Sequence, residues 1–134
     1  MTTPVREQEA RLPRRPRLVA VRGAGAQVSW TLLAANGRPL ARSTGLFAGD
    51  DELAAALREL LADRRELRFG LTQPGGSREW GWTAYLPARR SGSRERQPVA
   101  RSARGYLRMD QCRRGAAGFT AALDLVNESW PTGS

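Results

Sequence analysis

Short segments in which hydrophobic and other residues alternate recur along the chain. A strand with one buried face has hydrophobic residues at every second position. Residues with this spacing are Val28, Trp30, Leu32 and Ala34. Residues 18–21 form a further short apolar run. The dipeptide Asn36-Gly37 predicts a tight hairpin turn, and residues 40–43 are then the returning strand.

A helical pattern follows the first set of strands. Leucines recur at the spacing of one helix face, at Leu53, Leu57, Leu60 and Leu61. The acidic residues Asp50, Asp51 and Glu52 come directly before them. Negative side chains are favourable at the positive end of the helix dipole. The sequence therefore predicts an amphipathic helix that begins near residue 49.

The same succession of patterns recurs in the second half. Alternating hydrophobic residues predict strands at residues 67–71 and 80–86, with a turn at residues 74–77 between them. A polar loop at residues 91–96 precedes a returning strand at residues 99–106. Asp110 is then expected at the N-cap or in the first turn of a second helix. The apolar stripe of that helix comprises Cys112, Ala116, Phe119, Leu123 and Val126.

Two stretches of the sequence match each other. Trp30 and Trp82 are each followed by Thr, residues 39–43 read Pro-Leu-Ala-Arg-Ser, and residues 98–102 read Pro-Val-Ala-Arg-Ser. The match indicates an internal repeat, with a longer loop around residues 89–97 in the second copy. Two helices with matching apolar stripes over a set of strands predict a two-layer α+β domain.

The stretch Trp30-Thr-Leu-Leu-Ala-Ala-Asn36-Gly37-Arg-Pro-Leu-Ala-Arg-Ser43 resembles the repeat of the YegP-like family, small bacterial proteins of unknown function. That repeat consists of an aromatic strand, an Ala-x-Asn-Gly turn, a strand of the form apolar-x-x-Ser, and a helix. Family members carry two repeats in one chain, or one repeat in a chain that dimerises. The resemblance covers residues 18–126. In the second half a long loop replaces Asn-Gly, although Ser102, Gly105 and Tyr106 fit the pattern.

The resemblance implies an α+β fold of two tandem β-β-β-α repeats that share one antiparallel sheet, with two helices packed on one face. A single domain would then span residues 18–128, divided into repeats at 18–66 and 67–128. Residues 1–17 contain five Arg and three Pro and predict a disordered basic tail, and residues 129–134 predict a short C-terminal tail. A tandem repeat completes its own sheet, so we expect a monomer that is an intramolecular pseudo-dimer.

Arginine carries all of the positive charge. The chain of 134 residues has 22 Arg and no Lys, against 13 Asp and Glu, and its net charge is +9 at pH 7. Ile is also absent, and this bias indicates a GC-rich genome. The basic composition is therefore weak evidence of nucleic-acid binding by itself. Residues 1–49 carry +6, residues 50–66 carry −3 and residues 67–134 carry +6, so the first helix is acidic within a basic chain.

Missing residue types exclude several classes of catalytic site. Without His there is no Ser-His-Asp triad, no Cys-His pair and no imidazole ligand for a metal. Without Lys there is no Schiff base and no P-loop lysine. A single Cys excludes Cys-based zinc sites and an intramolecular disulfide. We therefore expect a protein that is not an enzyme, with no catalytic residue, no cofactor and no metal site.

Two motifs have both a chemical and a structural interpretation. The cluster Asp50-Asp51-Glu52 suits a hard cation such as Mg²⁺. Adjacent helical residues point in different directions, however, which favours a role in starting the helix. Cys112 lies near a helix N-terminus beside two arginines, and both features lower a thiol pKa. Its place on the apolar stripe instead favours a small buried residue.

Glycines in two places have a structural interpretation. Gly23-Ala24-Gly25 is followed by a strand, whereas a dinucleotide-binding loop needs a helix at that point. We therefore predict a hairpin loop. Gly115 and Gly118 lie inside the second helix, where each costs about 1 kcal/mol relative to Ala. Close packing of that helix on the sheet is the expected reason.

The aromatic residues also have two interpretations. Trp30 and Trp82 fit equivalent core positions beneath the two helices. On an exposed face beside arginines, aromatic rings instead stack on bases. A sheet with helices on one side leaves its other side open, and strand alternation puts Thr31, Leu33, Thr83 and Tyr85 there. The candidate binding surface comprises Trp80, Trp82, Tyr85, Arg89, Arg90, Arg94, Arg96 and Arg101.

Three functional hypotheses follow. An enzyme that uses carboxylates alone is the least favoured, because two acids would have to converge in a pocket and the acids lie mostly in the first helix and in turns. The other two are binding functions. The first is a non-catalytic binding module of unknown biochemical role, whose sheet face or strand edges contact a protein partner. The second is nucleic-acid binding through the Arg-rich loop, the N-terminal tail and an aromatic sheet face. No apolar run approaches the roughly 20 residues of a membrane-spanning helix, so we expect no membrane partner. Arginines before residues 18–21 resemble a twin-arginine signal, but the apolar run is too short, and we expect a cytoplasmic protein.

Overall fold

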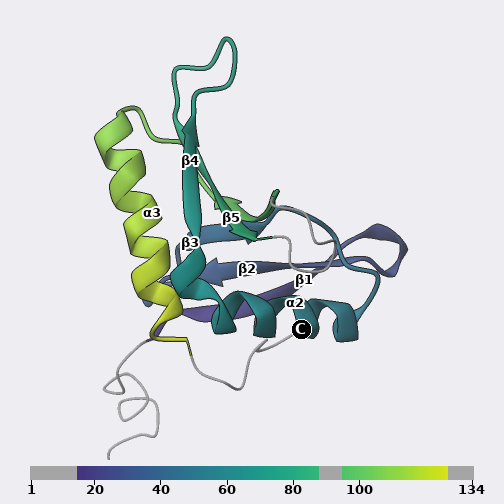
Figure 1. Ribbon diagram of the computed structural model, residues 1–134. Coiled ribbons are helices and arrows are strands. Elements are labelled where there is room, and N and C mark those ends of the chain that lie inside the picture. Colours follow the sequence, from purple (N-terminus) through teal and green to yellow (C-terminus); the bar gives the residue numbers. More distant parts are fainter. Residues whose placement is uncertain (1–14, 88–94, 127–134) are drawn as a thin grey trace, which may run out of the picture.

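The computed structural model describes residues 15–87 and 95–126 (Figure 1). Three strands precede a helix, and three further strands precede a second helix. These elements are β1 (Arg17–Arg22), β2 (Val28–Leu33), β3 (Pro39–Ser43), α2 (Asp50–Ala62), β4 (Arg68–Thr72), β5 (Gly81–Pro87), β6 (Arg96–Ser102) and α3 (Met109–Leu123). Two short 3-10 turns, η1 (Ala24–Ala26) and η2 (Arg64–Glu66), complete the described elements. The predicted α+β class is confirmed.

The described strands form one six-stranded antiparallel sheet in the order β1-β2-β3-β6-β5-β4. The third strand of each half therefore lies at the centre of the sheet, next to its counterpart. There Ala41 pairs with Ser102, and Arg42 pairs with Arg101. The sheet is strongly twisted, as Figure 1 shows, because β4 runs upright while β2 runs across the view.

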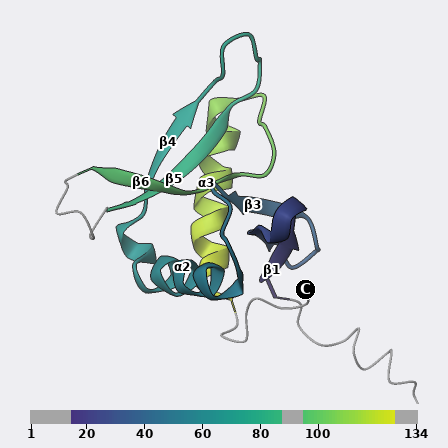
Figure 2. The same ribbon diagram turned by 90° about the vertical axis from the view of Figure 1, so that its right-hand side faces the viewer.

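Both helices pack on the sheet, α2 against β2 and α3 against β3, β4 and β5. Figure 2 shows α2 lying across the lower end of the upright α3. Between helices and sheet, Leu53 and Leu57 are completely buried, as their helical spacing predicts. Each buried leucine side chain contributes roughly 1.5–3 kcal/mol. In the second half Trp82 packs on Phe119, with ring centroids 4.9 Å apart.

Each buried tryptophan of the sheet is held by a serine of the neighbouring strand. The backbone N–H of Trp30 donates to Ser43 Oγ at 3.2 Å, and the backbone N–H of Trp82 donates to Ser102 Oγ, also at 3.2 Å. Ser43 is 7% exposed, and its hydroxyl donates in turn to the Gly45 carbonyl. The serine of the matching sequence stretches therefore has the same contact in both halves.

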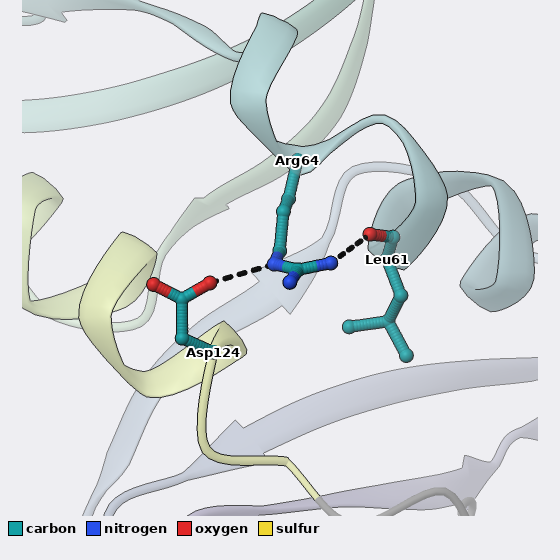
Figure 3. A network of polar contacts seen from close by, with 3 residues as sticks. All are labelled: Leu61, Arg64 and Asp124. Carbon is teal, nitrogen blue, oxygen red and sulfur yellow. Dashed lines mark hydrogen bonds and ion pairs between the residues drawn. The ribbon is translucent and has the colours of Figure 1, made fainter.

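The C-terminal ends of the two helices are joined by Arg64 (Figure 3). Its Nε donates to Asp124 Oδ1 at 2.6 Å, and its Nη1 donates to the Leu61 carbonyl at 2.6 Å. The Leu61 carbonyl lies in the last turn of α2, where carbonyls lack a partner within the helix. One side chain thus caps α2 and ties it to Asp124, the C-cap residue of α3.

Several predicted boundaries are wrong by a few residues. The last strand begins at Arg96 rather than at residue 99, because Arg96 and Gln97 pair with Pro87 and Leu86. It ends at Ser102, and Tyr106 forms only an isolated bridge with Trp80. The helix α3 ends at Leu123, so Val126 lies beyond it, although it still packs against the core.

Asp110 lies in the first turn of α3, whose N-cap is Arg108. The expected N-terminal tail falls almost wholly on residues 1–14, outside the described residues, and the expected C-terminal tail does so completely. β1 begins at Arg17, which had been assigned to the tail.

Candidate functional site

The described helices pack against the face of the sheet that carries the core, and none of them lies on the other face. Strand alternation places on it the side chains of Val19, Val21, Thr31, Leu33, Arg42, Arg101, Thr83 and Tyr85. We call this set the open face. Thr31, Leu33, Thr83 and Tyr85 are half-buried and belong to it, as predicted.

A continuous row of paired residues crosses the open face. Backbone pairing joins Val19 to Thr31, Thr31 to Arg42, Arg42 to Arg101, and Arg101 to Thr83. Two exposed arginines therefore stand side by side at the centre of the sheet, one on β3 and one on β6. Like charges directly opposite one another on antiparallel strands are destabilising.

The strands carry no negative charge that would compensate these arginines. Their six arginines are accompanied by no Asp and no Glu within the strand bounds. Arg22 pairs with Asp50 and Arg64 with Asp124 elsewhere, at 3.1 Å and 2.6 Å. Neither Arg42 nor Arg101 forms an ion pair with any residue that the structure describes. The centre of the open face is thus an uncompensated positive site.

A shallow groove of about 650 Å³ runs over the first half of this face. Its walls combine the two central arginines with apolar side chains, among them Val21 and Leu46. These two side chains are 44% and 62% exposed and are therefore accessible to a partner. The groove therefore offers apolar contact beside two positive side chains.

Two of the candidate binding residues lie on the wrong side of the sheet for this surface. Trp82 is 1% exposed and faces α3, where its rings pack on Phe69 and Phe119. The core interpretation of Trp82 is correct, and its assignment to a binding surface is wrong. Its indole nitrogen is buried without a hydrogen-bond partner among the described residues. Trp80 is half-buried and packs against the same core.

The other candidates have different outcomes. Tyr85 and Arg101 lie on the open face, as predicted. Arg96 belongs to β6 rather than to the preceding loop, because it pairs with Pro87. Arg89, Arg90 and Arg94 lie outside the described residues.

Arg42 was not among the candidates, although it faces Arg101 directly. The matching Pro-x-Ala-Arg-Ser stretches contained the signal, since Arg42 and Arg101 occupy the same position in both. A sheet in which the third strands of the two halves pair antiparallel brings such equivalent residues together. Sequence reasoning found the match but did not apply it to the pairing of the two central strands.

Cys112 is completely buried on the apolar stripe of α3, as predicted. Burial raises the pKa of its thiol, so the alternative of an activated thiolate is wrong. Nearby, the hydrogen bond from Arg114 to Asp110, 2.8 Å long, lowers the pKa of that carboxyl. The Asp110 carboxylate at the start of α3 is therefore paired with an arginine of the same helix.

Two of the three acidic residues at the start of α2 have contacts within the protein. Asp50 pairs with Arg22 at 3.1 Å, and Glu52 Oε2 accepts a hydrogen bond from the backbone N–H of Ala48 at 3.1 Å. Both contacts stabilise the beginning of the helix. No group of three metal-ligating side chains gathers anywhere in residues 15–87 and 95–126.

The structure tests the roles predicted for the glycines of the first hairpin and of the second helix. Gly25 has φ of +69° in η1, within the hairpin that joins β1 to β2, so the predicted loop is confirmed. Gly115 is closely packed, but against the Tyr106 side chain rather than directly against the sheet. Gly118 has open space around it, so close packing does not explain it.

Comparison with known proteins supports the fold and adds no activity. A scan against protein families found no match, and a search of curated proteins found none either. Among the described helices, none is long and apolar enough to cross a membrane.

A search of solved structures found the solution NMR structure of yegP from E. coli, a protein of unknown function. The match has a TM-score of 0.57 at 15% identity and covers 91% of this chain and 99% of yegP. This chain therefore has a YegP-like fold.

Proposed function

We propose that this protein is a non-catalytic binding module whose open face holds an acidic segment of a partner protein. The observation that carries the proposal is the pair of Arg42 and Arg101 at the centre of that face. The pair lies in a groove that also presents Val19, Val21 and Leu46. A segment that alternates carboxylates with apolar residues matches this arrangement in both charge and polarity.

The energetic cost of the arginine pair supports a role in binding. Two like charges opposite one another on antiparallel strands cost roughly 0.2–1 kcal/mol of stability. Neither arginine gains a partner within the described residues. A carboxylate placed between two guanidinium groups would turn this repulsion into attraction, with charge-assisted hydrogen bonds. Residues retained at a cost in stability are common at functional sites.

A non-catalytic role rests on the composition of the chain. With no His and no Lys, proton transfer near neutral pH would rely on carboxylates or on a perturbed Cys or Tyr. The single Cys is buried. The open face itself has arginine, threonine and tyrosine side chains, and no carboxylate within its strands.

We also propose that the two halves are copies of one β-β-β-α unit, related by an approximate two-fold axis between Arg42 and Arg101. Three sets of contacts support this. Trp30 and Trp82 bond to equivalent serines. Val28 bridges Phe47 as Trp80 bridges Tyr106. Thr44 N–H donates to the Val99 carbonyl as Ala103 N–H donates to the Leu40 carbonyl.

Such a chain completes its own sheet, so we expect a monomer. Separately, the single Cys and the short apolar run at residues 18–21 lead us to expect a cytoplasmic protein. Analytical ultracentrifugation at several concentrations tests the oligomeric state. A mass of 14.7 kDa supports the proposal. A mass of twice that value at all concentrations contradicts it.

Binding is tested with a fluorescein-labelled peptide of alternating Glu and Leu, followed by anisotropy at about 50 and 200 mM salt. We expect Arg42→Gln and Arg101→Gln each to weaken binding about fivefold or more. The matched control is Arg58→Gln, which removes the same charge from the exposed side of α2 and should leave binding unchanged. An equal loss in all three variants would show that only net charge matters and would contradict the proposal.

A labelled single-stranded oligonucleotide tests the second hypothesis in the same assay. Six arginines in strands without carboxylates favour contact with phosphates. The burial of Trp82 removes the aromatic pair that base stacking would need. Tighter binding of the oligonucleotide than of the peptide, lost in Arg42→Gln but not in Arg58→Gln, would replace the protein partner with nucleic acid.

A further inference from the structure

A second hollow lies on the helix side of the sheet, away from the open face. It has a volume of about 280 Å³ and lies between α2, the loop that follows β3, and the facing ends of β5 and β6. Its walls include Trp30 and Leu60, which are each 2% exposed. We call it the α2 pocket, and the lining residues used below are Trp30, Phe47, Ala56, Glu59, Leu60 and Gln97.

The second half of the chain fills the corresponding space with its own side chain. Tyr106 follows Ser102 at the same distance along the chain as Phe47 follows Ser43, and both form the isolated bridge described above. The Tyr106 ring lies against α3 at Gly115, where a Cβ would be only 2.5 Å from its Cζ. Arg104 covers the same ring, with its Cζ 4.7 Å from the ring centroid.

The first half has a different residue at the equivalent place in its helix. Ala56 occupies the position in α2 that Gly115 occupies in α3, counted from the matching serines. Its methyl group stands where the glycine leaves room for an aromatic ring. Phe47, which forms the equivalent backbone bridge to Val28, lines a hollow together with Ala56. The α2 pocket is the space that remains beside it.

The size and walls of the α2 pocket suit a single ring. An apolar cavity of about 150 Å³ is enough to hold benzene. A pocket of about 280 Å³ therefore accommodates one six-membered ring with a short substituent. Trp30 and Leu60 give it an apolar floor, and Phe47 gives it an aromatic wall.

The charge at the mouth of the α2 pocket is negative. Glu59 lines this pocket and also a neighbouring hollow of about 490 Å³, whose other acidic residues are Asp51 and Glu52. No arginine lines either hollow among the described residues. Glu59 and Asp51 form no ion pair with a described residue. Among the described residues, Glu59 therefore gives this pocket a local negative charge.

We propose that the α2 pocket binds a small aryl amine, with its aromatic ring on Trp30 and Leu60 and its positive group beside Glu59. The ring adds apolar contact to that made by Phe47 at the wall of the pocket. The ammonium group finds the carboxylate at the mouth. This site is separate from the open face and does not depend on the function proposed for that face.

The probes are tyramine and its uncharged counterpart 4-ethylphenol, titrated into the full-length protein and followed by ¹H–¹⁵N correlation spectra. Tyramine should shift the amides of Trp30, Ala56 and Leu60 and should bind about fivefold more tightly than 4-ethylphenol. Glu59→Gln should weaken tyramine about fivefold and leave 4-ethylphenol unchanged. The matched control Glu79→Gln, which removes the same charge elsewhere, should change neither.

A second pair of variants tests the origin of the α2 pocket. Ala56→Gly removes the methyl group, so Phe47 should settle on α2 and both probes should lose binding. Ala54→Gly imposes the same loss of helix propensity and should keep binding. The proposal is overturned if tyramine shifts no amide of the α2 pocket, if Glu59→Gln and Glu79→Gln act alike, or if Ala56→Gly binds both probes as the unaltered protein does.

Discussion

Two glycines of α3 make a matched pair for testing the packing of this fold. Both lie inside the helix Met109–Leu123, three residues apart, and both would gain helix propensity on replacement by alanine. A Cβ at Gly118 would meet nothing within 4 Å beyond its neighbours in the chain and the backbone of its own helix, whereas a Cβ at Gly115 would overlap the Tyr106 ring. The two substitutions therefore share one favourable effect and differ in one steric effect.

The magnitudes follow from these surroundings. Gly118→Ala should stabilise the protein by about 0.8–1 kcal/mol, the difference in helix propensity. That gain corresponds to a rise in Tm of about 3–5 °C for a chain of this length. Gly115→Ala has the same gain, but insertion of a methyl group into a packed site costs about 1–3 kcal/mol. Its net effect should be a loss of about 1 kcal/mol.

Urea unfolding followed by tryptophan fluorescence measures both free energies, because Trp30 and Trp82 are buried in the native state. Gly115→Ala combined with Tyr106→Ala serves as a control, since removal of the ring should make the added methyl group favourable. If Gly115→Ala stabilises the protein as much as Gly118→Ala, Tyr106 does not lie on α3. The comparison that explains the α2 pocket would then fail as well.

Three further predictions concern polar groups and the thiol. Arg64→Met should cost about 1 kcal/mol of unfolding free energy, because it removes the bonds to Asp124 and to the Leu61 carbonyl, and a loss below about 0.3 kcal/mol would contradict this role. Asp110 has a lowered pKa in the folded state, so its contribution is complete above its unfolded pKa and disappears as pH falls through the folded pKa. The stability difference between the unaltered protein and Asp110→Asn should therefore shrink below about pH 4, and a difference that grows there would refute the assignment. Cys112 should react with a thiol reagent only at the rate of unfolding, and rapid labelling of the native protein would contradict its burial.

Local periodicity predicted the elements well where one face is buried. Alternation located β2 and β5, and the leucine spacing located α2, because a half-buried element needs a regular apolar pattern. The boundaries of β6 were less accurate. Its first residues, Arg96 and Gln97, are polar, and only their pairing with β5 makes them a strand.

The candidate site was harder to predict, because it depends on contacts between distant segments. Alternation correctly grouped Tyr85 with Thr83 on the face without helices. The candidate surface nevertheless combined Tyr85 with Trp82, which the same alternation puts on the opposite face, where it is buried. The pairing of Arg42 with Arg101 joins residues from opposite halves of the chain. The origin that we propose for the α2 pocket, the methyl group of Ala56, follows only from comparison with Gly115 in the other half of the chain.

The central claim, that the open face holds an acidic segment through Arg42 and Arg101, is tested most directly by mapping the contact. The alternating Glu-Leu peptide is titrated into the ¹⁵N-labelled full-length protein at about 50 mM salt. We expect the largest amide shifts along the row Thr31, Arg42, Arg101 and Thr83, and their loss in Arg42→Gln. Shifts confined to α3 or to residues 88–94, with the central row unchanged at saturation, would contradict the account.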